Sequence, residues 1–342
     1  MALHRSRAIH PLRAALGLAR TARAHWRESQ RFHEKQWRYR FSPGLLEREQ
    51  ARADAAPNVL SAPQLEMSVD GLDGAAAARH LQRLGCLLVR GNEQTRTTVA
   101  AFRDFLDRVG YTAMGVPRGG ALWFKGENGF HFHMHRLVQK HFYELCRHYL
   151  DSPVLLSSFE TSASIRSVAH TGTGLVPFHQ DISPVAIDRA LTFWIAIDPD
   201  DIGEKAPGLR FIASTRSRRS RMMSRNATTH ELTRPGLRAD EFFWTPKINA
   251  GDVMIFDGYA PHASYSHDAM ALPRTSVDLR ISRYDAQQAI SYLKAGHGSL
   301  IFDREEMIAP VGRTANAPPE FSYDLKRVAS PALREAAALM VG

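Results

Sequence analysis

The chain has 342 residues, 44% of them hydrophobic and 23% charged, so it can bury a sizeable core in one large domain or two small ones. Its formal net charge is +9, and much of the surplus lies in residues 1–27, which hold six arginines and no acidic residue. No apolar run reaches the ~18 residues that a membrane span requires, and no zinc-finger spacing or aromatic–basic platform points to nucleic-acid binding.

The arginine-rich head has two interpretations. It is either an organellar targeting peptide or a basic surface helix, and we favour the helix. We therefore expect residues 1–55 to be a basic helical extension, residues 56–342 to form the main domain, and the protein to be cytoplasmic, with an organelle as the alternative. Cys86 and Cys146 lie in apolar segments and are predicted to be buried free thiols, which fits a reducing compartment.

The first half of the chain is mainly helical in pattern. A short helix is predicted over residues 74–84, where Gly85 stops it, and a buried strand follows over residues 86–89. Apolar residues at helical spacing predict two further helices, over residues 98–109 and 134–149.

After Pro153 the pattern changes to short β-rich segments separated by turn residues. The predicted strands cover residues 154–159, 161–168, 175–182, 191–197, 209–213, 253–257 and 276–283. Residues 330–340 are predicted to form a closing helix, with Ser330 as its N-cap and Pro331 at the first helical position. This order favours a mainly β fold with flanking helices, an antiparallel barrel or jelly roll.

One strand carries a metal-binding pattern. His179 and Asp181 are two residues apart in an extended run, so both side chains point to the same face. His262, just past the apolar run 253–256, supplies a third ligand. Two histidines and one carboxylate form the facial triad, which leaves three coordination positions open and suits non-haem Fe(II).

A basic residue follows the triad at a useful distance. Arg274 comes twelve residues after His262, and Ser276 follows on the next predicted strand. An arginine fork beside a hydroxyl is suited to a bidentate grip on a carboxylate, and the expected partner is the distal carboxylate of 2-oxoglutarate.

With these residues in place, the sequence resembles the phytanoyl-CoA dioxygenase family of Fe(II)/2-oxoglutarate oxygenases over roughly residues 75–285. The matching pieces are Phe178–Asp181, Leu191–Ile197, Pro207–Ile212 and Gly251–Phe256, followed by His262 and Arg274. The resemblance implies a double-stranded β-helix.

The resemblance also implies roles for single residues. The iron-binding positions of the family match His179, Asp181 and His262, and its 2-oxoglutarate-binding arginine matches Arg274. Trp194 and Ser264 match positions in the cofactor pocket. The implied reaction consumes O2 and 2-oxoglutarate, releases succinate and CO2, and hydroxylates a small molecule.

Two features bear on the reaction and the substrate. The carboxylate of Asp181 argues for hydroxylation over halogenation, whereas desaturation, ring closure and epimerisation use the same triad. Where the family commonly has a Gly-Ser-His-like stretch, this chain reads Ala-Ser-Thr-Arg at residues 213–216, and residues 216–225 hold five arginines. Arg216, joined by Lys125, is a candidate for capturing an anionic or carrier-tethered acyl substrate.

Two alternatives remain open. The histidines of the run 131–135 could form a cupin-type metal site that needs no 2-oxoglutarate, although no carboxylate lies near them in sequence. The other alternative is a jelly-roll protein that binds a metabolite or a partner without turnover. The sequence leaves the substrate and the oligomeric state undetermined.

Overall fold

A computed structural model describes residues 58–59, 65–108, 121–122, 130–158, 163–168, 179–181, 190–214, 241–285 and 299–308, together with Pro331 and Arg334. All of them belong to one compact unit formed by residues 56–232 and 237–342. The basic head and the arginine-rich segment 216–225 lie outside the described residues. The extension, its boundary near residue 55 and the location of the protein therefore stay predictions.

The first helix shows why local signals were sufficient to place it. Helix α3 spans Gly74–Leu84, as predicted, because both of its ends are capped. Asp73 accepts hydrogen bonds from the amides of Ala75 and Ala76 (2.9 and 3.0 Å). At the other end Gly85 takes the left-handed conformation (φ 80°) and its N–H donates to the carbonyl of Leu81 (2.8 Å).

Helices α4 (Glu93–Arg108) and α5 (Phe130–Leu150) begin earlier than predicted. In α4 the side chain of Asn92 accepts from the amide of Thr95 (3.0 Å) and so starts the helix. The first turns that follow are polar, and for this reason the apolar periodicity becomes visible only from Val99. Of the closing helix predicted over residues 330–340, Pro331 and Arg334 are helical and the remainder lies outside the described residues.

A large sheet forms the centre of the fold. Its strand order is β14-β13-β5-β12-β7-β10-β3-β2, and β6 adds to β12 and carries β4. The strands are β2 (Glu66–Ser68), β3 (Cys86–Arg90), β4 (Ala121–Leu122), β5 (Leu155–Ser158), β6 (Ala163–Val168), β7 (Ala190–Asp198), β10 (Val253–Asp257), β12 (Arg274–Arg283), β13 (Ser299–Phe302) and β14 (Met307–Ile308). Most neighbouring pairs are antiparallel.

A second, smaller sheet has the order β1-β9-β8-β11. Its strands are β1 (Asn58–Val59), β9 (Glu241–Trp244), β8 (Gly208–Ser214) and β11 (His262–Tyr265). Seven short strands among the described residues were not predicted, namely β1, β2, β4, β9, β11, β13 and β14. Residue His179 pairs with His262, so the end of the predicted strand 175–182 lies beside β11.

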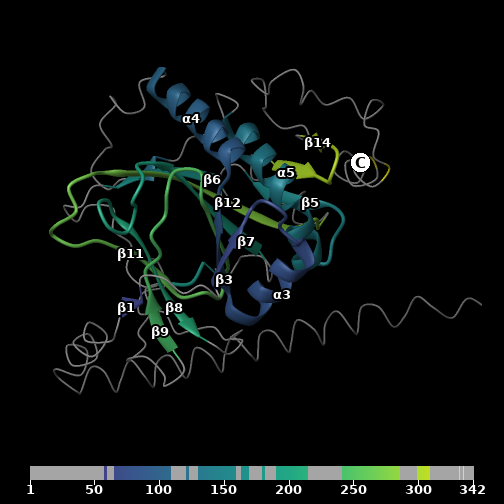
Figure 1. The fold of residues 1–342 in the computed structure, drawn as a ribbon. Helices are drawn as coiled ribbons and strands as arrows, with labels where there is room; N and C mark the ends of the chain where they lie inside the picture. Colours follow the sequence, from purple (N-terminus) through teal and green to yellow (C-terminus); the bar gives the residue numbers. More distant parts are fainter. Residues whose placement is uncertain are drawn as a thin grey trace, which may run out of the picture. The chain divides into compact units, whose positions relative to one another are not determined.

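The large sheet separates two hydrophobic cores. Phe193 and Ile195 of β7 pack with the helices on one face, whereas Trp194 and Ala196 of the same strand pack with the small sheet on the other. Figure 1 shows the helices α3, α4 and α5 on one side of the large sheet and β8, β9 and β11 on the other. Two facing sheets buttressed by helices confirm the predicted mainly β fold, a double-stranded β-helix.

Helices α3 and α5 approach each other so closely at Gly74 that a side chain would not fit there. A Cβ atom on Gly74 would lie 2.6 Å from the backbone nitrogen of Leu145 in α5. Glycine at the first position of α3 therefore permits the two helices to pack closely.

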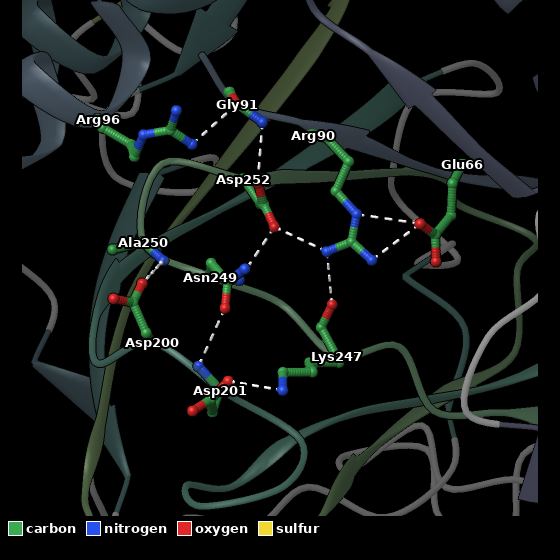
Figure 2. Close-up of polar contacts among 10 residues, drawn as sticks. All are labelled: Glu66, Arg90, Gly91, Arg96, Asp200, Asp201, Lys247, Asn249, Ala250 and Asp252. Atoms are coloured by element: carbon green, nitrogen blue, oxygen red, sulfur yellow. Dashed lines mark hydrogen bonds and ion pairs between the residues drawn. The ribbon is translucent and has the colours of Figure 1, made fainter. Parts of the chain in front are cut away.

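A polar network closes the end of the fold where β10 begins (Figure 2). Asp252 is its centre: the carboxylate accepts from the Arg90 guanidinium (2.9 Å) and from the amides of Gly91 (2.8 Å) and Asn249 (3.0 Å). Arg90 also donates to Glu66 and to the carbonyl of Lys247. Every oxygen of the Asp252 carboxylate thus has a protein donor.

Cys86 and Cys146 are buried free thiols, as predicted. Among the described residues, no helix is long and apolar enough to cross a membrane.

Candidate metal centre

The His-x-Asp segment is held in place by its backbone and by its middle residue. His179 and His262 exchange two backbone hydrogen bonds, of 2.9 and 3.0 Å. Between the two ligands, Gln180 is buried and donates from Nε2 to the carbonyl oxygen of Tyr259 (2.6 Å). Because alternate residues of an extended segment point to opposite faces, this anchor leaves His179 and Asp181 together on the other face.

Three donor atoms converge there. Asp181 Oδ1 lies 3.6 Å from His179 Nε2 and 4.0 Å from His262 Nε2, and one ligand atom from each residue lies within 4.8 Å of the others. Metals take nitrogen and oxygen donors at about 2.0–2.2 Å, so one ion can be shared by all three after a small inward movement of the side chains. Within the part of the chain that the structure describes, this is the one group of histidine, cysteine and carboxylate side chains that meets this condition.

Local contacts fix the imidazole of His262 for this purpose. Its Nδ1 lies 3.0 Å from the carbonyl oxygen of Ala260, so Nδ1 carries the proton and Nε2 keeps a lone pair that faces Asp181. Its ring packs against Phe256 (4.5 Å between centroids) and Phe211 (5.7 Å). Burial and the neighbouring His179 lower the pKa of His262 to about 3, so the imidazole is neutral, as a metal ligand must be.

Asp181 is ionised although its side chain is only 8% exposed. Burial by itself would raise the pKa of the carboxyl group, but the charge of Arg280 and the contacts with the two histidines outweigh it and lower that pKa well below its usual value. The Arg280 guanidinium contacts both carboxylate oxygens: Nη2 lies 3.0 Å from Oδ1 and Nε lies 3.3 Å from Oδ2. The hydroxyl of Thr192 donates to Oδ2 as well (2.9 Å).

Arg274 lies farther along the same face of β12. It is only 2% exposed, it donates from Nη1 to the carbonyls of Pro207 (3.2 Å) and Gly208 (2.9 Å), and its guanidinium lies 5.3 Å from the centroid of the Trp194 ring. Two residues on, Ser276 is fully buried, and its hydroxyl has no hydrogen-bond partner among the described residues.

One cavity brings most of the predicted residues together. Its lining includes His179, Asp181, His262, Trp194, Ser264 and Arg274. Ser276 does not line it but follows Arg274 on the same face of the strand. Lys125 and Arg216 lie outside the described residues, so their substrate role stays a prediction.

The histidine run 131–135 lies in the first turns of α5 and not on a strand. In a helix, residues two apart do not share a face, so alternation does not bring these side chains together. His133 is exposed, whereas His135 is buried with its Nε2 2.8 Å from the hydroxyl of Ser157. Nothing in the described part of this run supports the cupin-type site.

The residues present fit iron and 2-oxoglutarate. Two imidazoles and one ionised carboxylate are the donor set that suits non-haem Fe(II). The buried guanidinium of Arg274 lines the cavity, and two residues on along β12 the buried hydroxyl of Ser276 has no hydrogen-bond partner among the described residues. These are the groups that a carboxylate would bind.

Sequence reasoning missed Arg280, Thr192 and Asp278, all of which line the cavity. A signal for Arg280 was available, since residues 276, 278 and 280 fall on one face of the strand predicted over 276–283. The pairing of Arg280 with Thr192 could not be predicted in the same way. The two residues lie opposite each other on β12 and β7, and this register depends on the whole sheet.

The family model of phytanoyl-CoA dioxygenase matches residues 81–274 of this chain. No curated protein sequence matched. Among solved structures, the 2-oxoglutarate-dependent carbocyclase SnoK from nogalamycin biosynthesis is similar, with 18% identity, a TM-score of 0.44, and coverage of 64% of this chain and 87% of that chain. The epimerase SnoN from nogalamycin biosynthesis is similar with 17% identity, a TM-score of 0.44, and coverage of 68% of this chain and 88% of that chain. AviO1 from Streptomyces viridochromogenes Tue57 is similar with 17% identity, a TM-score of 0.43, and coverage of 62% of this chain and 95% of that chain.

Proposed function

The chain belongs to the phytanoyl-CoA dioxygenase family, and from this premise we propose that it hydroxylates a small molecule with release of succinate and CO2. It is an oxidoreductase that uses iron and 2-oxoglutarate. The choice of hydroxylation and the identity of the substrate are the proposal.

A single observation carries the proposal: the three donor atoms of His179, Asp181 and His262 and the guanidinium of Arg274 face one cavity. A metal site alone would suit many functions. A metal site with a buried arginine at the other part of its cavity suits a cofactor that has a chelating end and a distal carboxylate, which is the form of 2-oxoglutarate.

Each group of side chains in and near the cavity would have a separate role in the reaction. His179, Asp181 and His262 would hold the iron, and Arg274 with Ser276 would hold the distal carboxylate of 2-oxoglutarate. Iron held by these residues would supply the activation of O2, coupled to decarboxylation of 2-oxoglutarate. The aromatic surfaces of Trp194 and Phe256 line the cavity and help to exclude water from it.

Asp181 supports hydroxylation over halogenation, since its carboxylate occupies the position that a halogenase leaves open for chloride. The same triad serves desaturation, ring closure and epimerisation, so the product must be identified directly. An anionic or carrier-tethered substrate is part of the proposal and depends on residues 125 and 216, which are outside the described segments.

Anaerobic titration of the purified protein with Fe(II) and 2-oxoglutarate tests the site. A weak visible charge-transfer band from the chelate is expected in the wild type. It should be absent in His179→Ala, which loses an iron ligand, and should need much more 2-oxoglutarate in Arg274→Ala. Succinate release on admission of O2, followed by mass analysis of candidate substrates for addition of one oxygen atom, tests the reaction.

The chain offers matched controls. His133 and Arg283 are exposed and lie away from the cavity, on α5 and at the end of β12. His133→Ala and Arg283→Ala should therefore leave the band unchanged. If no band forms in the wild type at saturating iron and 2-oxoglutarate, the oxygenase function is wrong and a binding protein becomes the better interpretation.

A further inference from the structure

Arg280 does more than keep the Asp181 carboxylate ionised, because its guanidinium contacts both oxygens of that group. It lies on β12 directly across from Thr192 on β7. Both side chains reach the carboxylate of Asp181, from neighbouring strands of the same sheet. Asp181 is therefore held by two residues that lie on adjacent strands in the middle of the large sheet.

The two oxygens of Asp181 are used differently. Oδ2 accepts two hydrogen bonds, from Thr192 Oγ1 (2.9 Å) and Arg280 Nε (3.3 Å). Oδ1 accepts one, from Arg280 Nη2 (3.0 Å), and faces the Nε2 atoms of both histidines. Since a carboxylate oxygen has two lone-pair sites, Oδ2 is satisfied by the protein and Oδ1 keeps one site directed toward the histidines.

The shape of the arginine contact adds a second constraint. A guanidinium that contacts both oxygens with two of its nitrogens occupies the space between those oxygens. An ion chelated by both oxygens would have to lie in that same space. The fork and a chelating carboxylate therefore exclude each other.

We propose that Arg280, together with Thr192, is a positioning residue that restricts Asp181 to binding iron through Oδ1 alone. This inference depends on the proposed function. Its consequence is an extra coordination position: two imidazoles and one oxygen leave three positions open, whereas a chelating carboxylate would leave two. With 2-oxoglutarate chelated, the third position remains available for O2.

A simpler role for Arg280 would be to neutralise a buried negative charge. The two roles predict different results when Arg280 is replaced by lysine. Lysine retains the positive charge, but its single nitrogen is a point charge and lacks the planar fork. Charge neutralisation therefore predicts that Arg280→Lys resembles the wild type, whereas the positioning role predicts that it resembles Arg280→Met.

The experiment counts the water molecules bound to the metal. The full-length protein is loaded with Mn(II), saturated with 2-oxoglutarate, and examined by water-proton relaxation. One bound water is expected in the wild type. In Arg280→Met and Arg280→Lys the carboxylate is expected to chelate the ion, so the relaxation due to bound water should be lost. Arg283→Lys and Arg283→Met, on the same strand, should match the wild type.

Each outcome is decisive. If both Arg280 variants keep the bound water, the proposal is overturned, and if Arg280→Lys alone keeps it, charge neutralisation is the correct role. If Arg280→Met does not fold, Arg280→Lys decides in the same way. Failure of the proposed function looks different, because the wild type itself would then fail to bind Mn(II) or to respond to 2-oxoglutarate.

Discussion

Asp252 and Asp181 lie near opposite ends of β10, their side chains are largely buried, and each is held by an arginine. Asp252 precedes the first residue of the strand and contacts Arg90 (Figure 2), whereas Asp181 contacts Arg280 and Thr192, and Thr192 pairs with Phe256 near the last residue of β10. Around Asp252 the remaining positions are filled by backbone amides. Around Asp181 they face the Nε2 atoms of His179 and His262.

The difference teaches how to distinguish a structural carboxylate from a ligand. Burial and an arginine partner are common to both sites. What separates them is whether the other neighbours are backbone donors or metal-ligating side chains. Backbone donors complete the Asp252 network and leave nothing for an ion, whereas the Asp181 carboxylate faces two imidazole nitrogens, the kind of atom that binds a metal beside a carboxylate.

The largest expected effect is that of Asp181→Ala on activity. Loss of an iron ligand should abolish 2-oxoglutarate turnover, exceeding the roughly 10–100-fold loss that follows removal of a residue behind a metal ligand. The fold should persist, because the Arg280 side chain that loses its partner is 29% exposed and can be hydrated instead. Succinate production and the circular dichroism spectrum measure the two parts. An active Asp181→Ala enzyme would remove the distinction between the two aspartates.

Asp252→Ala should have the opposite result to Asp181→Ala, with a loss of stability and no change in iron binding. It leaves Arg90 and two backbone amides without their acceptor, so the free energy of unfolding should fall by about 3–5 kcal/mol. Urea denaturation with an unchanged m-value measures this loss. The affinity of the remaining folded protein for iron should match that of the wild type. A loss of less than about 1 kcal/mol would show that the network is not essential.

Thr192→Val should have a smaller effect, confined to the metal centre. It removes one donor to Oδ2 of Asp181 while Arg280 still contacts that oxygen, so metal affinity should fall by about tenfold. Competition with a chelator measures the affinity. Thr98, which is partly exposed on α4, provides a control: Thr98→Val should leave metal affinity unchanged. An unchanged affinity in Thr192→Val would mean that the hydroxyl does not orient the carboxylate.

The smallest effect concerns Asp201, at the border of the Asp252 network. Hydrogen bonds from Lys205 (2.6 Å) and Lys247 (2.8 Å) lower the pKa of Asp201 to about 2. A depressed pKa stabilises the fold at pH values above the unfolded value of about 4, and this contribution is lost as the pH falls toward 2. Asp201→Asn should therefore be less stable than the wild type at pH 7.

The difference in urea midpoint between Asp201→Asn and the wild type should shrink as the pH is lowered from 5 to 3. A difference that stays constant over this range would show that the ion pairs with the two lysines do not contribute. Iron binding should be the same in both proteins at pH 7, because Asp201 belongs to the network at the other end of β10.

The sequence predicted well what depends on neighbouring residues. Helix α3 was placed to the residue, because Gly85 marks its end. His179 and Asp181 were predicted as metal ligands because the period of a strand puts them on one face. His262 was predicted as the third ligand from its place after a buried strand, and the structure brings the three side chains together, while their role as ligands stays a prediction.

What the sequence did not reveal depends on contacts between distant segments. Arg280 and Thr192 act on Asp181 through the register of β12 and β7, and no local pattern encodes this register. The Asp252 network joins segments near residues 66, 90, 200 and 250, so no single segment carries its signature. Strands as short as β2 and β11 have too few residues for alternation to be recognised.

The backbone pairing of His179 with His262 has a further consequence for local motion. The two residues are joined by two main-chain hydrogen bonds, and a shared ion would join them again through their side chains. Opening the pair would then require both connections to break, so exchange of these two amide protons with solvent should become slower when the metal is bound. Their exchange rates would report directly on metal occupancy, independently of turnover, in any variant that still folds.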